Sequence, residues 1–311
     1  MAPRRILVTG AGGFVAGHLL PQLRAAFPAA ELVLMGGQGT SIDLADTAAV
    51  SGFVGAAAPD ACIHLAAISG VPAATGDADA AWRVNVLGTL ALARALQKAR
   101  PEAVLLYASS AEVYGRSFAA GVALDETAVP APMNTYAATK AAADLALGAM
   151  AASGLRVVRL RPFNHTGPGQ SADFVVPAFA RQVARIAAGV QAPVLKVGAL
   201  DPYRDFLDVR DVCAAYVACL AHPGLVPGVI LNLASGTPRR IGDILDALLA
   251  LAGVTAEIST GTALLRRAEI PTASGNAGAA RLALGWHPTI PWDQTLADVL
   301  ADWRTRVTSE A

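Results

Sequence analysis

The chain begins with a short apolar strand, a glycine-rich turn and an apolar helix. Ile6–Val8 forms the strand pattern, Gly10 and Gly13 lie in the turn, and Phe14–Phe27 has the apolar spacing of a helix. Glycines let a backbone approach a pyrophosphate closely, and a helix N-terminus supplies free N–H groups and a favourable dipole. A glycine cluster alone is often a plain turn. Its place between the first strand and a helix favours a dinucleotide-binding unit.

Strand and helix patterns continue to alternate through the first half of the chain. Such alternation indicates a parallel, doubly wound sheet, so we predict an α/β fold of Rossmann type. The expected strands are Ile6–Val8, Leu32–Met35, Ala61–Leu65, Val104–Ala108 and Arg156–Arg161, and the expected helices are Phe14–Phe27, Thr47–Ala57, Trp82–Arg100 and Thr135–Ala152.

The composition is that of a compact, heavily buried enzyme. Of the 311 residues, 54% are hydrophobic and 15% are charged. Lys plus Arg and Asp plus Glu number 24 each, so no overall field attracts nucleic acid or an anionic membrane. No apolar run reaches the ~18 residues of a membrane span, and we expect a cytoplasmic protein. Cys62, Cys213 and Cys219 follow neither metal nor disulfide spacing, which predicts buried thiols and no metal site.

Tyr136 and Lys140 form the first candidate catalytic pair. Residues four apart on a helix share one face, and an ammonium beside a phenol favours the phenolate. An unperturbed tyrosine titrates near ~10, so it needs such help to act as an acid or base near neutrality. The pair alone is weak evidence, since an alanine-rich helix can hold Tyr and Lys at this spacing by chance.

A second candidate group follows a buried strand pattern. Val104–Ala108 is apolar, and Ser109, Ser110, Glu112 and Tyr114 come directly after it. Open α/β sheets bind their ligands at the carboxyl ends of their strands. The sequence therefore predicts that this strand end delivers hydroxyl groups to a ligand site.

Together these segments resemble the extended short-chain dehydrogenase/reductase family, in its sugar-nucleotide branch of NAD-dependent epimerases and dehydratases. Thr9, Gly10 and Gly13 match the family's glycine fingerprint, while Ala16 stands where the last glycine is usual. The resemblance implies a catalytic set, which is Ser110, Tyr136 and Lys140, with Glu112 beside it.

The same resemblance implies how the chain is divided. Residues 1–165 would form the Rossmann domain, and residues 204–235 would return to it. Residues 166–203 and 236–311 would form a smaller α/β lobe that binds a nucleotide-sugar.

The end of the second expected strand bears on the choice of cofactor. An NAD site commonly has an acidic residue there to hold the ribose 2′-hydroxyl. Residues 35–39, Met-Gly-Gly-Gln-Gly, contain none, so NADP(H) is favoured and NAD(H) remains possible. Asp43 could contact adenine or be a solvated turn residue, and His64 could be purely structural. The implied cofactor-binding residues are Gly10, Gly13, Phe14, Val15, Asp43, Leu44, Leu65, Ala66, Ala67, Asn85, Tyr136 and Lys140.

Two downstream stretches concern the substrate. Residues 161–170 place an amide and an imidazole after a strand, and residues 197–212 contain Arg204 and Arg210 among aspartates. Arginine binds diphosphate oxygens bidentately, although both arginines could instead form ion pairs on a loop. With the tail at residues 265–272 and 284–288, these stretches resemble the GDP-4-keto-6-deoxy-D-mannose reductases, which make GDP-D-rhamnose. The implied substrate-binding residues are Ser110, Glu112, Asn164, Arg204, Arg266 and Glu269.

Other activities on this fold stay open from the sequence. Glu112 suits a GDP-mannose 4,6-dehydratase, which must remove the C5 proton, and a nucleotide-sugar 4-epimerase uses the same Ser, Tyr and Lys. A dinucleotide sensor without activity would usually lack the tyrosine. Relatives dimerise through two long helices, here Trp82–Arg100 and Thr135–Ala152, whose apolar faces could equally pack on the chain's own sheet.

Overall fold

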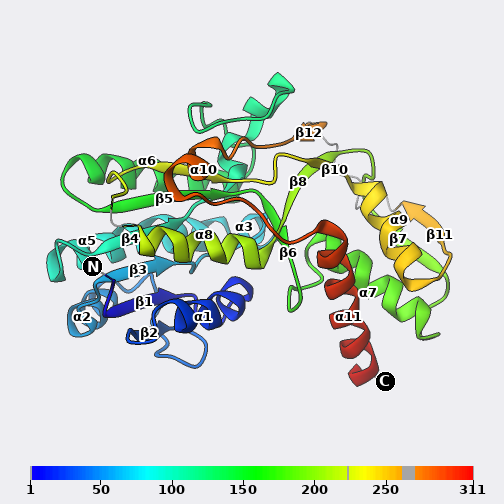
Figure 1. The fold of residues 1–311 in the computed structure, drawn as a ribbon, viewed down its shortest axis with the longest axis horizontal. Coiled ribbons are helices and arrows are strands. Elements are labelled where there is room, and N and C mark those ends of the chain that lie inside the picture. Colours follow the sequence, from blue (N-terminus) through cyan, green and yellow to red (C-terminus); the bar gives the residue numbers. More distant parts are fainter. Residues whose placement is uncertain (1, 223, 261–269, 311) are drawn as a thin grey trace.

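The larger part of the molecule is a parallel sheet covered by helices on both faces (Figure 1). The computed structural model describes residues 2–222, 224–260 and 270–310. Among these, the sheet has six strands in the order β2-β1-β3-β4-β5-β9. All of its pairings are parallel. The strands are β1 (Arg5–Thr9), β2 (Glu31–Met35), β3 (Ala61–His64), β4 (Val104–Ala108), β5 (Val157–Pro162) and β9 (Ile230–Leu233).

Helices cover each face of this sheet because successive strand residues point to opposite sides. Ile6 and Val8 pack under α1 (Phe14–Ala26), α8 (Val209–Ala221) and α10 (Gly278–Leu284). Leu7 packs on the other side, under α2 (Thr47–Ala57), α5 (Thr89–Ala99) and α6 (Thr135–Ala152). Both faces are thus buried, as an all-parallel sheet requires. The predicted Rossmann-type α/β fold is confirmed.

The prediction of a single helix over Trp82–Arg100 was wrong. The structure has three consecutive segments there: α4 (Ala78–Trp82), a π-helical turn η1 (Arg83–Gly88) and α5. At the junction the Thr89 hydroxyl donates to the Asn85 carbonyl at 2.8 Å and competes with the regular backbone bond. Two further short helices, α3 (Val71–Gly76) and the 3₁₀ segment η2 (Ala111–Ala120), were not expected.

A smaller lobe lies beside the carboxyl ends of the large sheet (Figure 1). Its apolar core is formed mainly by α7 (Val175–Ala187), α9 (Ile241–Ala252) and α11 (Trp292–Glu310). Its strands are short and come from distant parts of the sequence. They are β6 (Asn164–Thr166), β7 (Val194–Val197), β8 (Tyr203–Asp208), β10 (Pro238–Arg240), β11 (Glu257–Thr260) and β12 (Thr272–Ala273).

The chain passes between the two lobes several times. Strand β8 pairs with β6, β10 and β12, whereas α8 packs on α1 and β9 forms the edge of the large sheet. Helix α10 returns to α8 and β9. We propose a domain division that departs from the one implied by the resemblance at two elements, because these contacts favour β8 with the smaller lobe and α10 with the larger one.

Two findings bear on composition. Cys62, Cys213 and Cys219 are buried free thiols, as their apolar surroundings predict. In the three described ranges, no helix is both long and apolar enough to cross a membrane.

Candidate active site at the carboxyl edge of the sheet

The glycine turn after β1 brings three backbone segments into close contact. Gly10 has φ +67°, and a Cβ there would lie 2.8 Å from the Ala66 nitrogen. A Cβ on Gly12 would lie 2.7 Å from the Gly37 Cα. Gly13 caps α1 without a side-chain hydrogen bond, so N–H groups of the first turn stay available. Only glycine suits this turn, and its shape fits an approaching pyrophosphate.

A cavity of about 320 Å³ opens beside this turn. Asp43 is the one charged residue in its lining, and its carboxylate accepts a hydrogen bond from the Ala45 N–H at 2.9 Å. The remaining lining is apolar or neutral, which suits the adenosine half of a dinucleotide. The lining residues are Gly10, Met35, Gly36, Ser41, Ile42, Asp43, Leu44, Ala66, Ala67, Ile68 and Val84.

The other expected cofactor residues lie around the turn and cavity. Phe14 and Val15 begin α1 and are half-buried, and Leu65 is partly buried next to the Gly10 turn. Asn85 is buried, and its amide is used within the protein. It accepts from the Ile68 N–H at 2.8 Å and donates to the Ile68 carbonyl at 3.1 Å. Its contacts therefore brace a loop that lines the cavity.

His64 has a structural position. Its ring nitrogens lie 2.7 Å from the Thr9 hydroxyl and 2.9 Å from the Thr89 hydroxyl, and the residue is 1% exposed. Burial, with a smaller contribution from Lys140, lowers the His64 pKa to about 3. The ring is therefore neutral near pH 7 and ties β1 to β3 and α5.

Helix α6 positions the candidate catalytic pair. Asn134 caps it by accepting from the Ala137 N–H at 2.9 Å, so Tyr136 and Lys140 lie in its first turns. The Tyr136 phenol faces the Ser110 side chain and interacts with it. Lys140 Nζ donates to the Ala108 carbonyl at 2.7 Å. The strand end and the helix start thus bring the three expected groups together.

The electrostatics of Tyr136 differ from the expectation. Burial raises the Tyr136 pKa to about 12; the interaction with Ser110 opposes that shift, and the charge of Glu112 adds to it. The lowering expected from Lys140 is outweighed, because burial penalises a phenolate strongly. Burial also lowers the Lys140 pKa to about 8, and Asp144 opposes that shift. Tyr136 therefore keeps its proton at neutral pH, as a proton donor must.

Glu112 and Arg204 face the same region from the two lobes. The Asn134 amide lies 3.5 Å from a Glu112 carboxylate oxygen. Glu112 interacts electrostatically with both Tyr136 and Arg204. Arg204 donates to the Tyr203 carbonyl at 2.7 Å, and in the described part of the chain it has no ion pair with a carboxylate. Burial lowers its pKa. A half-buried guanidinium without an ion-pair partner among the described residues is suited to binding an anionic ligand.

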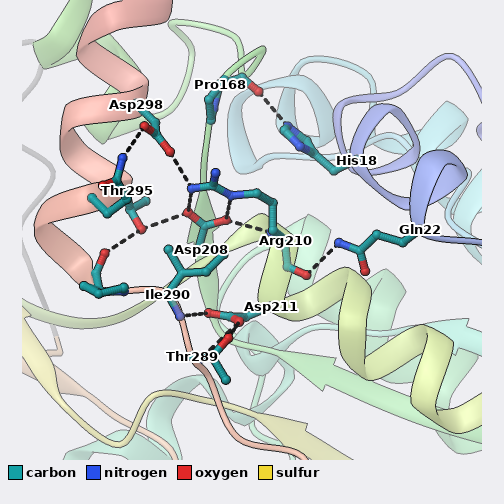
Figure 2. A network of polar contacts seen from close by, with 12 residues as sticks. His18, Gln22, Pro168, Asp208, Arg210, Asp211, Thr289, Ile290, Thr295 and Asp298 are labelled. Carbon is teal, nitrogen blue, oxygen red and sulfur yellow. Dashed lines mark hydrogen bonds and ion pairs between the residues drawn. The ribbon is translucent and has the colours of Figure 1, made fainter. Parts of the chain in front are cut away.

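Arg210 behaves differently, although the sequence places it only six residues away. It forms ion pairs of 2.7 Å with Asp208 and Asp298 (Figure 2). The alternative considered from the sequence, that an arginine here only forms ion pairs, therefore holds for Arg210, which lies at the start of α8.

The remaining substrate candidates are only partly described. Asn164 begins β6 and is half-buried. The neighbouring His165 ring is stacked on Phe14, with a centroid distance of 6.4 Å. Arg266 and Glu269 lie outside the described residues.

The sequence interpretation missed a buried carboxylate behind the catalytic pair. Asp144 is 0% exposed and is bound by Ser109, Arg159 and Arg161. The available signal was its spacing, because it lies one helical turn after Lys140 in a helix rich in alanine.

The fold and this site agree with known proteins. A family model described as the NAD dependent epimerase/dehydratase family matches residues 6–234. The chain belongs to this family. The recognition made from the glycine turn and the Ser-Tyr-Lys set is confirmed.

The most similar relatives extend along nearly the whole chain. The chain is 39% identical over 308 residues to the GDP-6-deoxy-D-mannose reductase of Pseudomonas aeruginosa. The aligned region covers 99% of each protein. It is 27% identical to a GDP-6-deoxy-D-talose 4-dehydrogenase of Aggregatibacter actinomycetemcomitans, over 88% of each. The structure of RMD from Pseudomonas aeruginosa complexed with NADPH superposes with a TM-score of 0.87 at 37% identity, over 97% of this chain and 99% of that one.

Proposed function

We propose that the protein reduces the C4 ketone of GDP-4-keto-6-deoxy-D-mannose and forms GDP-D-rhamnose. The observation that carries the reaction type is the convergence of Ser110, Tyr136 and Lys140 at the sheet edge, where a dinucleotide fits. The substrate follows from the full-length likeness to a GDP-6-deoxy-D-mannose reductase.

The residues would divide the work as follows. A bound nicotinamide cofactor supplies the hydride that this chemistry needs. Tyr136, held protonated by burial, donates its proton to the C4 oxygen as negative charge develops there. Ser110 donates a hydrogen bond to the same oxygen. Lys140 would hold the cofactor ribose. Its positive charge would stabilise the Tyr136 phenolate that forms when the proton is donated.

We propose NADP(H) as the preferred cofactor. The segment after β2 offers no carboxylate to a ribose, and Asp43 is the one charged group that lines the adenosine cavity. A relative with 37% identity was solved with NADPH. NAD(H) would also fit this cavity.

The GDP end would be held from the smaller lobe. Arg204 offers a guanidinium that forms no ion pair with a carboxylate among the described residues, and Asn164 begins the neighbouring strand. Arg266 and Glu269 complete the proposed set by resemblance. We further propose a homodimer, because Trp82 of α4, Leu87 of η1 and Leu145 of α6 are 43%, 61% and 56% exposed. We also propose a cytoplasmic location.

The decisive experiment follows NADPH absorbance at 340 nm. GDP-4-keto-6-deoxy-D-mannose, made in situ from GDP-mannose by a dehydratase, should cause rapid oxidation that depends on the keto-sugar. The Tyr136→Phe variant should bind NADPH and turn over little.

The rival activities give different results in the same assay. A dehydratase would consume GDP-mannose without an added enzyme, for which Glu112 is the candidate base. An epimerase would interconvert C4 isomers without net NADPH loss and would be purified with bound NAD. Silence with NADPH and NADH alike would reject the reductase, and a sensor would keep its response in Tyr136→Phe.

A further inference from the structure

A buried ion cluster lies directly behind the catalytic lysine. The Asp144 carboxylate accepts from Arg161 Nε and Nη2, both at 3.0 Å, and from Arg159 Nη1 at 3.0 Å. The Asp144 and Arg161 side chains are 1% and 2% exposed. Burying these charges is costly, so the cluster would be expected to serve more than stability.

The same carboxylate also binds the segment between β4 and η2 that contains Ser110. The Ser109 hydroxyl donates to Asp144 Oδ2 at 2.6 Å, and the Ser109 N–H donates to the Leu160 carbonyl at 2.8 Å. Lys140, one turn earlier on α6, donates to the Ala108 carbonyl at 2.7 Å. Two successive turns of the helix therefore hold two consecutive residues, immediately before Ser110.

Few charged groups surround Lys140. Asp144 follows it on α6, and Arg159 and Arg161 face Asp144 from β5. Asp144 is the group that favours the protonated form of Lys140, against the effect of burial.

The other titratable neighbours of Lys140 are neutral near pH 7. His64, from β3, has a pKa of about 3. The Tyr107 ring, from β4, lies 5.1 Å from Lys140 Nζ, and burial raises the Tyr107 pKa well above its ordinary value. The Tyr136 pKa is raised to about 12. Because these three neighbours stay neutral, loss of the Asp144 charge should change the Lys140 pKa without a compensating change in their protonation.

We propose that Asp144 is a positioning residue of the active site, which fixes Ser110 against Tyr136 and Lys140 by binding Ser109, directly after β4, and the arginines on β5. This inference rests on the proposed reductase function. Asp144 touches neither substrate nor cofactor and acts through Ser109 and Lys140.

The first test needs neither substrate nor cofactor. The chain contains three lysines, Lys98, Lys140 and Lys196, of which the first and last are exposed. In protein labelled with ¹³C at lysine Cε, the pKa of Lys140 can be read from one of three signals. Asp144→Asn should lower this pKa by roughly one unit or more, because the ammonium loses its nearest opposite charge.

A second variant separates position from charge. Ser109→Ala keeps the ion pairs of Asp144 with Arg159 and Arg161. It removes only the hydrogen bond from the Ser109 hydroxyl to Asp144. It should leave the Lys140 pKa nearly unchanged but shift the ¹³Cζ signal of Tyr136, one of five tyrosines, because the Ser110 contact moves. Asp211→Asn is the matched control. Asp211 is also a buried carboxylate, but it accepts from Thr289 and Ile290 and should change neither signal.

Kinetics then test the link to catalysis. With the keto-sugar, Ser109→Ala should lower kcat by about 10-fold and Asp144→Asn by about 100-fold, with KM within about twofold, since small displacements of reacting groups have effects of this size. Asp144→Asn should also move the alkaline limb of the pH–kcat profile to lower pH.

The outcomes distinguish this inference from the proposed function. An unchanged Lys140 pKa in Asp144→Asn would overturn the inference, as would Ser109→Ala with wild-type kcat and Tyr136 signal. If Asp144→Asn does not fold, the Ser109→Ala signals decide. If wild type turns over no keto-sugar, the reductase fails while the two NMR results still decide the role of Asp144.

Discussion

Two clusters of arginine and aspartate in this molecule use the same chemistry in different surroundings. In the first, Asp144 and Arg161 are 1% and 2% exposed and lie within the larger lobe, behind Lys140. In the second, Arg210 and Asp298 are 33% and 25% exposed and lie between the lobes. Because solvent screens the second far more than the first, the two clusters should respond differently to substitution, pH and salt.

The second cluster joins α8 of the larger lobe to α11 of the smaller one (Figure 2). Asp208 accepts from Arg210 at 2.7 Å and from the Thr295 hydroxyl at 2.8 Å. Nearby, His18 on α1 lies 2.7 Å from the Pro168 carbonyl. The comparison indicates that the first cluster orders the catalytic residues and that the second holds the lobes together.

The largest effect on stability is expected at the first cluster. Asp144→Ala would leave the Arg161 charge buried without a partner, and Arg161 Nη1 already lacks one within the described residues. The free energy of unfolding should fall by about 3–5 kcal/mol, measured by urea titration. Asp298→Ala, in the second cluster, should cost about 1 kcal/mol or less. Equal losses in the two variants would remove the distinction.

The first cluster's surroundings should also make the protein sensitive to acid. The His64 pKa is about 3 in the fold against 6.5 for an ordinary histidine, so below pH 6.5 the unfolded state binds a proton that the native state refuses. Stability should therefore fall as pH is lowered from 6.5, by about 1.4 kcal/mol per pH unit from this residue. His64→Gln should remove that slope, taken as the difference between the two proteins' urea titrations. Parallel curves for the two proteins would contradict it.

Arg204 and Arg210 sharpen the contrast between binding and bracing. Arg204→Ala should raise KM for the GDP-sugar about 10–100-fold with a small change in kcat, because it removes a charge-assisted contact to the ligand. Arg210→Met is the matched variant and should leave KM near that of wild type. Steady-state kinetics of both variants would show this, and a raised KM in Arg210→Met alone would reverse the assignment.

A modest effect is expected on the stability of Arg210→Met. Asp208 would keep the Thr295 hydroxyl and the Arg210 N–H, so the loss should be about 1–2 kcal/mol. The loss should shrink in 1 M salt, where the Debye length is about 3 Å. A loss that does not change with salt would indicate that Arg210 contributes by packing.

The larger lobe was predictable because local patterns determine its elements. Thr47–Ala57, Val104–Ala108 and Thr135–Ala152 begin and end where the sequence predicts. Their apolar periodicity and the alternation of strand and helix are readable within short windows. The smaller lobe was not, since a three-residue strand such as Asn164–Thr166 has no period of its own and pairs with residues about forty positions away.

The site was predictable to a similar extent. The pair Tyr136 and Lys140 follows from helical spacing, but the burial that raises the tyrosine pKa depends on tertiary packing. Arg204 and Arg210 look alike in the sequence, and only Asp298, on α11, makes one of them a brace. Asp144 looked like any polar helix residue because its partners lie on other strands.

The most direct test of the account is the rate of NADPH oxidation by the purified protein with GDP-4-keto-6-deoxy-D-mannose, in wild type and in Tyr136→Phe. The account predicts oxidation that requires the keto-sugar, and a kcat about 10²–10⁴-fold lower in the variant, because the proton donor is lost. NADPH binding should be retained in Tyr136→Phe. Absence of oxidation by wild type, or full activity in the variant, would contradict the account.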